Sequence, residues 1–154
     1  MSKIRLAIVV SEFNKEITNE MLRTAISHSK KLEMDIKKIC HVPGTFDMPL
    51  VVEKLLKNEQ IDVVVTLGAV IKGETGHDQV IANNTARLLS NLSLKYQKPV
   101  TLGITGPDMT FEQALARTKI VPLRAVNAAV KMVIRMKKIR NAKPRSAAKV
   151  TTID

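Results

Sequence analysis

Cysteine and aromatic residues are scarce in this chain. Among 154 residues there are one cysteine, no tryptophan, one tyrosine and three phenylalanines. The single cysteine, Cys40, excludes an internal disulfide, and its place in an apolar run predicts a buried structural thiol. The N-terminus leads directly into a strand-like stretch without a signal-peptide pattern, so we expect a reducing, cytoplasmic setting.

Long hydrophobic runs are also missing. No apolar stretch approaches the ~18 residues that cross a bilayer, so we expect no membrane association. Hydrophobic residues make up 45% and charged residues 25%, which is typical of a globular domain. We expect one domain over residues 1–140 and a mobile, basic tail over residues 141–154.

Acidic residues are missing from the C-terminal end. Between Gln113 and Ile153 there are 11 basic residues and no acid, whereas the remainder carries 14 residues of each sign. The net charge of +11 therefore comes from one end of the chain. A polyanion could be held there, but a basic tail is more often a solvated end, and the body of the protein is not built around nucleic acid.

Apolar periodicity predicts an alternation of strands and helices. The strands are expected at residues 5–10, 36–42, 63–70 and 100–104. The helices are expected from about residue 17, at residues 49–57, 77–97 and 111–116, and from residue 122 to about 140. Pro122 suits a first-turn position. Right-handed crossovers then give an α/β fold with a four-stranded parallel sheet covered on both faces.

Parallel sheets of this kind bind ligands outside the carboxyl ends of their strands. That rule brings together four loops, at residues 11–14, 43–47, 71–77 and 105–109. In the second loop, Thr45 or Asp47 could cap the following helix, although such a stretch taken alone is more often a plain strand–helix connection. In the third, Gly73 and Gly76 permit close approach of a ligand, and the free N–H groups at the helix start suit a phosphate. Spacing alone leaves a phosphate site and a simple turn both open.

Histidine is the remaining titratable residue of interest. His28 falls within the first helix and is expected at the surface, and His41 lies near a strand end, packed or hydrogen-bonded. Only His77 occupies a strand-end loop, where an imidazole could act beside a bound anion. No His, Cys or carboxylate cluster has metal-ligand spacing, so no metal is expected, and neither a Walker loop nor a dinucleotide fingerprint is present.

Four stretches together resemble the lumazine synthase family, in its archaeal branch. They are Ile8 to Asn14 with Ile17 and Thr18, Val42 to Pro49, Gly68 to His77, and Gln113 to Arg117, within a match from about Lys3 to Lys137. The resemblance implies a flavodoxin-like α/β/α sandwich. It also implies a riboflavin-pathway transferase that condenses 5-amino-6-(D-ribitylamino)uracil with 3,4-dihydroxy-2-butanone 4-phosphate. The products are 6,7-dimethyl-8-ribityllumazine, phosphate and water, formed without cofactor or metal. The implied homo-oligomer is a pentamer or an assembly of pentamers, with active sites between subunits.

The resemblance also assigns roles to residues. Phe13 would stack on the pyrimidine, Arg117 of the adjacent subunit would oppose the phosphate, and His77 would shuttle protons. The implied residues are Phe13, Asn14, Thr45, Phe46, Asp47, Ala69, Val70, Ile71 and Leu102 for the pyrimidine and its ribityl chain, Gly73, Glu74, Thr75 and Arg117 for the phosphate, and His77 for catalysis.

The sequence departs from the family pattern in three places. Leu102 stands where many members have phenylalanine, so the partner-side wall of the ring pocket is expected to be aliphatic. The stretch from Thr118 to Arg124 replaces a Gly/Lys-rich segment, so a second phosphate lysine is not assigned. The basic tail from Asn141 extends past the usual end of the family.

Three other functions compete with this interpretation. An archaeal-type riboflavin synthase shares the ancestry, but it has no phosphorylated substrate to explain the Gly73–His77 loop and Arg117. A nucleic-acid-binding module would use the basic C-terminal end and would bind with a steep salt dependence. A non-catalytic scaffold would have no need of Phe13, His77 and Arg117, all of which are present.

Overall fold

The structure is a computed structural model that describes residues 2–142 and 150–154. Strands and helices alternate along the chain, as expected. In order they are β1 (Arg5–Ser11), α1 (Lys15–Lys31), β2 (Asp35–Val42), the 3₁₀ turn η1 (Thr45–Asp47), α2 (Met48–Leu56), β3 (Val63–Ala69), α3 (His77–Tyr96), β4 (Val100–Thr105), α4 (Phe111–Leu115) and α5 (Ile120–Asn141).

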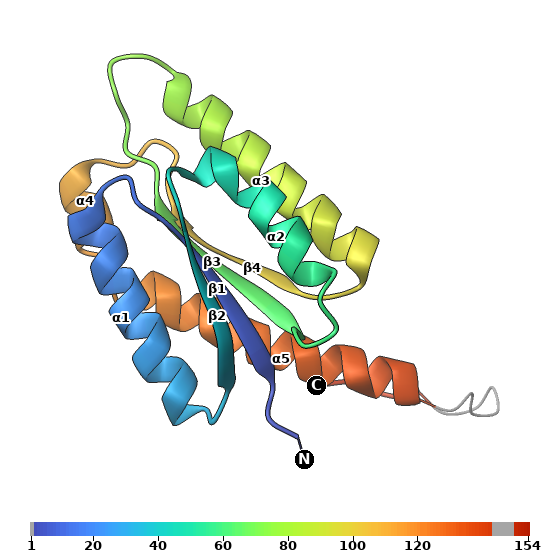
Figure 1. The fold of residues 1–154 in the computed structure, drawn as a ribbon. Helices are drawn as coiled ribbons and strands as arrows, with labels where there is room; N and C mark the ends of the chain where they lie inside the picture. Colours follow the sequence, from blue (N-terminus) through green and yellow to red (C-terminus); the bar gives the residue numbers. More distant parts are fainter. Residues whose placement is uncertain (1, 143–149) are drawn as a thin grey trace.

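The four strands form one parallel sheet in the order β2-β1-β3-β4. Helices α1 and α5 cover one face, and α2 and α3 cover the other (Figure 1). This three-layer α/β/α sandwich confirms the predicted fold class. It follows from right-handed crossovers, which return each strand parallel to the last and leave the helices on both faces.

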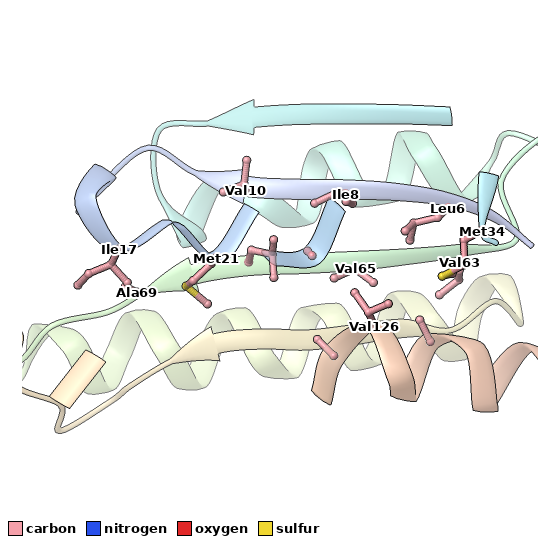
Figure 2. Close-up of a cluster of buried hydrophobic side chains, with 14 of the residues drawn as sticks. Leu6, Ile8, Val10, Ile17, Met21, Met34, Val63, Val65, Ala69 and Val126 are labelled. Atoms are coloured by element: carbon pink, nitrogen blue, oxygen red, sulfur yellow. The ribbon is translucent and has the colours of Figure 1, made fainter. Parts of the chain in front are cut away.

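Alternating side chains of the central strands fill two separate cores. On one face, Leu6, Ile8 and Val10 of β1 pack with residues of α1 and α5, as Figure 2 shows for Ile17, Met21 and Val126. The opposite set from β1 packs against α2 and α3. Full burial of each such aliphatic side chain stabilises the fold by roughly 1.5–3 kcal/mol. Burial on both faces explains why β1 and β3 are continuous apolar runs in the sequence.

Some predicted boundaries differ from the structure. Helix α1 begins at Lys15 rather than near Ile17, and α5 begins at Ile120 rather than at Pro122, so Pro122 lies in the first turn of α5, as predicted. Proline is tolerated there because the first four N–H groups of a helix have no hydrogen-bond partner within the helix. The mobile tail was predicted from Asn141 onward, but residues 143–149 lie outside the described residues. Over the described part of the chain, no helix is long and apolar enough to cross a membrane.

The environments of Cys40 and two histidines depend on their strand or helix. Cys40 is half-buried rather than buried, because β2 is an edge strand whose outer face is only partly covered. His28 was expected at the surface but is half-buried, with Nε2 2.8 Å from Oδ1 of Asn127 on α5. His41, on β2, is exposed.

Candidate active site

The loops after β1, β2 and β3 enclose an open cleft of about 710 Å³. Its size lies within the ~300–1,000 Å³ of ordinary ligand sites, and its position at the carboxyl ends of the strands is the predicted one. Eleven of the fourteen residues assigned from the sequence line this cleft. They are Phe13, Asn14, Thr45, Phe46, Asp47, Ala69, Val70, Ile71, Gly73, Thr75 and His77.

Two exposed phenylalanine rings border the cleft. Phe13 is 69% exposed and Phe46 is 60% exposed, although the whole chain has only three phenylalanines. The Phe13 ring lies against the backbone of Gly44, where an added Cβ would come within 3.0 Å of Cδ2. Glycine at position 44 therefore lets the ring lie close to the chain. Exposed aromatic rings that border a cleft are suited to stacking on a flat ligand.

Asn14 joins the first loop to the third. It precedes α1 in the left-handed conformation, with φ 60° and ψ 53°, which asparagine tolerates better than most residues. Its Nδ2 donates a hydrogen bond to the carbonyl of Ala69 at 2.9 Å. This bond holds the residue after Phe13 against the end of β3.

The second loop is closed by its own side chain. Oδ2 of Asp47 accepts a hydrogen bond from the N–H of Gly44 at 2.9 Å, and neither Thr45 nor Asp47 caps α2 through its side chain. Asp47 occupies the N-cap position of α2 but makes no side-chain cap bond to it, because its carboxylate turns back to Gly44 across the 3₁₀ turn η1. Thr45 is buried, and its carbonyl accepts a hydrogen bond from Oγ1 of Thr85 on α3 at 3.3 Å.

The loop leading into α3 stands out beyond the strand ends (Figure 1). Residues 72–77 are exposed, and Oγ1 of Thr75 accepts from the N–H of His77 at 3.4 Å. A Cβ added to Gly73 or Gly76 would meet nothing within 4 Å, so a single chain does not itself require glycine there. The first N–H groups of the 20-residue helix α3 and an exposed imidazole lie together at the mouth of the cleft, an arrangement that suits an anion.

The same loop is tied to the loop after β4. The N–H groups of Val70 and Lys72 donate to the carbonyls of Thr105 and Met109, each at 2.8 Å. Lys72 Nζ forms an ion pair with the carboxylate of Asp108, and this hydrogen bond raises the pKa of Lys72. These contacts hold the third and fourth loops as one unit.

Three lining residues were not predicted: Gly44, Asp78 and Ile81. Of these three residues, Asp78 could most readily have been predicted from the sequence, because the helix dipole favours an acid in the first turn of a helix, here directly after His77. It is buried, and its Oδ2 accepts a hydrogen bond from the N–H of Asp108 at 2.9 Å. That partner is 30 residues away in sequence, so no local pattern indicates it.

The three other predicted residues do not border the cleft within the described chain. Glu74 is exposed on the loop that leads into α3. Arg117 follows α4 and is exposed, with Nη1 donating to the carbonyl of Gln113 at 2.8 Å. Leu102 is 54% exposed on the edge strand β4, where it lines a separate groove of about 240 Å³ with Leu94 of α3. Arg117 and Leu102 are the two residues that were predicted to face a neighbouring subunit.

Metal ligands are not grouped in the described part of the chain. No set of three His, Cys, Asp or Glu side chains there could hold a metal ion. The chemistry available in the cleft is instead that of an imidazole, a carboxylate, aromatic rings and backbone N–H groups.

Fold and cleft together define a flavodoxin-like α/β protein with a small-molecule site at its strand ends. Residues 3–137 match the family model described as 6,7-dimethyl-8-ribityllumazine synthase. The chain is 57% identical over 136 residues to the 6,7-dimethyl-8-ribityllumazine synthase of Metallosphaera sedula, which covers 88% of this chain and 90% of the relative. It is 55% identical over 139 residues to the enzyme of that name from Sulfolobus acidocaldarius, covering 90% and 88% of the two chains.

The chain belongs to the 6,7-dimethyl-8-ribityllumazine synthase family. It is a transferase of riboflavin biosynthesis, and the family, enzyme class and condensation predicted from the sequence are thereby confirmed. Neither the scaffold nor the nucleic-acid-binding alternative is favoured by these matches.

Proposed function

We propose that the cleft is one half of an active site for the condensation of 5-amino-6-(D-ribitylamino)uracil with 3,4-dihydroxy-2-butanone 4-phosphate, and that a neighbouring subunit supplies the other half. This proposal rests on one observation. Phe13 and His77 open into the same strand-end cleft, whereas Arg117 and Leu102 lie outside it within the described chain. A phosphorylated substrate in this cleft would thus lack its arginine unless another copy of the chain supplied one.

The pyrimidine and its ribityl chain occupy the part of the cleft formed by the first two loops. The exposed ring of Phe13 stacks on the pyrimidine, with Asn14 beside it. Asp47, with Thr45 and Phe46, binds the ribityl chain. The exposed carboxylate of Asp47 can still accept hydrogen bonds from hydroxyl groups, because the N–H of Gly44 bonds to only one of its two oxygens, Oδ2.

The end of β3 forms the floor of the pyrimidine site. Ala69, Val70 and Ile71 present backbone groups and an apolar wall to the ring. Asn14 already uses the carbonyl of Ala69. The wall contributed by Leu102 comes from the neighbour and is aliphatic.

The phosphate binds where α3 begins. Gly73, Glu74 and Thr75 surround it with backbone N–H groups, and Arg117 of the neighbouring subunit approaches from outside. The open space around Gly73 supports this arrangement, because no described residue lies within 4 Å of a Cβ added there.

His77 transfers protons during the reaction. The amine attacks the ketone and one water leaves to form an imine, phosphate is then expelled, and ring closure onto the remaining carbonyl releases a second water, so protons move at every stage. An exposed imidazole at the cleft can both accept and donate them. We expect His77 to contribute on the order of 10²-fold, with most of the acceleration coming from holding two substrates together.

We further propose a pentamer, alone or in larger assemblies, located in the cytoplasm. The free edge of β4 and the exposed Leu94 and Leu102 beside it support a subunit contact at this edge. Sedimentation equilibrium of the purified protein tests the assembly, and a monomer with full activity would contradict a shared site.

The reaction is tested by incubating purified protein with both substrates. Absorbance and fluorescence report the lumazine, and a coupled assay reports phosphate. Product and phosphate in equal amounts support the proposal, whereas their absence from folded, assembled protein refutes it.

A further inference from the structure

Asp78 is a buried carboxylate to which the reaction described above gives no part. It stands in the first turn of α3, directly after His77, and only 5% of its surface is exposed. A carboxylate is buried at a cost of several kcal/mol unless it is well partnered. Its Oδ2 accepts a hydrogen bond from the N–H of Asp108, at 2.9 Å, in the loop between β4 and α4.

The hydrogen bond from Asp108 to Asp78 helps to hold the shape of the loop between β4 and α4. Asp108 lies in the left-handed region, with φ 57°, which is unfavourable for a residue other than glycine and is only partly relieved in aspartate. Its carboxylate pairs with Lys72, and its N–H is held by Asp78. Both groups of Asp108 are therefore attached to the segment that leads into α3.

The loop between β4 and α4 also leads, through α4, to Arg117. Thr110 caps α4, accepting a hydrogen bond from the N–H of Gln113 at 3.2 Å, and the carbonyl of Gln113 accepts one from Arg117 Nη1 at 2.8 Å. Few residues separate Asp108 from this short helix. A shift of the loop would therefore move α4 and the guanidinium that follows it.

We infer that Asp78 is a positioning residue that locks the β4–α4 loop to the start of α3, and so holds the phosphate-binding groups of two clefts in register. In its own subunit it orients the first turn that carries His77. Through Asp108 and α4 it orients Arg117, which serves the neighbouring subunit's cleft. This inference rests on the proposed function, because it assumes that Arg117 binds the phosphate of the second substrate.

Steady-state kinetics of Asp78→Ala and Asp78→Asn test this role. We expect Asp78→Ala to raise the KM for the phosphorylated substrate roughly 10-fold, less than the ~10²-fold loss that a misplacement of 1 Å can cause. The inhibition constant of inorganic phosphate should rise in parallel, while the KM for the pyrimidine stays unchanged. Asp78→Asn keeps an oxygen that can accept from Asp108, so it should stay within about threefold of the parent protein.

Asp62→Ala is the matched control. Oδ2 of Asp62 also accepts a backbone hydrogen bond, from Arg5 at 2.8 Å, but at the opposite end of the sheet. We expect this variant to lower Tm and leave both KM values unchanged.

Three results would overturn the inference: no change in the KM for the phosphorylated substrate in Asp78→Ala, equal increases in both KM values, or an Asp78→Asn variant as defective as Asp78→Ala. The proposed function is judged separately, on the parent protein. If the parent forms lumazine and phosphate but Asp78→Ala behaves like it, only the positioning role is wrong. If the parent forms neither, both proposals fail.

Discussion

Replacing Phe13 by alanine should weaken substrate binding much more than it destabilises the fold. The ring is 69% exposed, so about a third of its surface is buried. Full burial of a phenylalanine stabilises a protein by roughly 1.5–3 kcal/mol, so Phe13→Ala should cost roughly 0.5–1 kcal/mol of unfolding free energy. Stacking of a base on an aromatic ring contributes about 1–3 kcal/mol, which corresponds to a Kd that is roughly 5- to 150-fold weaker without it.

Titration calorimetry with the pyrimidine substrate measures the first effect, and thermal unfolding measures the second. Phe13→Tyr is the control, because it keeps a ring over Gly44 and should bind within about threefold of the parent protein. A Phe13→Ala variant with unchanged Kd would refute the stacking role. A large fall in Tm would show instead that the ring is a structural element, for example in a subunit contact.

Three further predictions concern catalysis, the phosphate and pH. His77→Ala should lower kcat on the order of 10²-fold while sedimentation shows the same assembly, and an unchanged kcat would remove the proton-transfer role. Arg117→Ala should raise the KM for the phosphorylated substrate roughly 10- to 100-fold with little change in Tm, and unchanged kinetics would contradict its assignment. Hydrogen bonds from Tyr96 and Lys95 lower the pKa of Glu53 to about 2 from an ordinary 4.5, so its stabilising effect is complete above pH ~4.5 and is lost as pH falls toward 2. The Tm difference between the parent and Glu53→Gln should therefore shrink over that range, and a difference independent of pH would contradict the shift.

The sequence predicted which residues lie together at the strand ends better than it predicted local capping. Eleven assigned residues line one cleft, because carboxyl ends of parallel strands meet at one edge of a sheet whatever the details of each loop. No side-chain cap forms on α2, because the Asp47 carboxylate bonds to Gly44 across the 3₁₀ turn η1 that precedes the helix. The contribution of Asp78 to the cleft was not predicted, because a single acid in the first turn of a helix is common and its hydrogen-bond partner, Asp108, lies far along the chain.

The burial of Cys40 shows a different limit. An apolar run predicts a strand, but it does not say whether that strand lies at the centre or the edge of the sheet. Edge position, and with it partial exposure, is decided by strand order. Strand order arises from the packing of the whole chain.

By itself, the sequence determined the α/β class, the burial of β1 and β3, and membership of the family, because each of these depends on local patterns or on motifs contiguous in the chain. Only the tertiary structure decided how the loops are joined. The bond from Asn14 to Ala69 spans 55 residues, and the bond from Asp108 to Asp78 spans 30. Such contacts depend on where crossovers place distant segments. For the same reason only the folded chain shows that Arg117 and Leu102 lie outside the cleft of their own subunit.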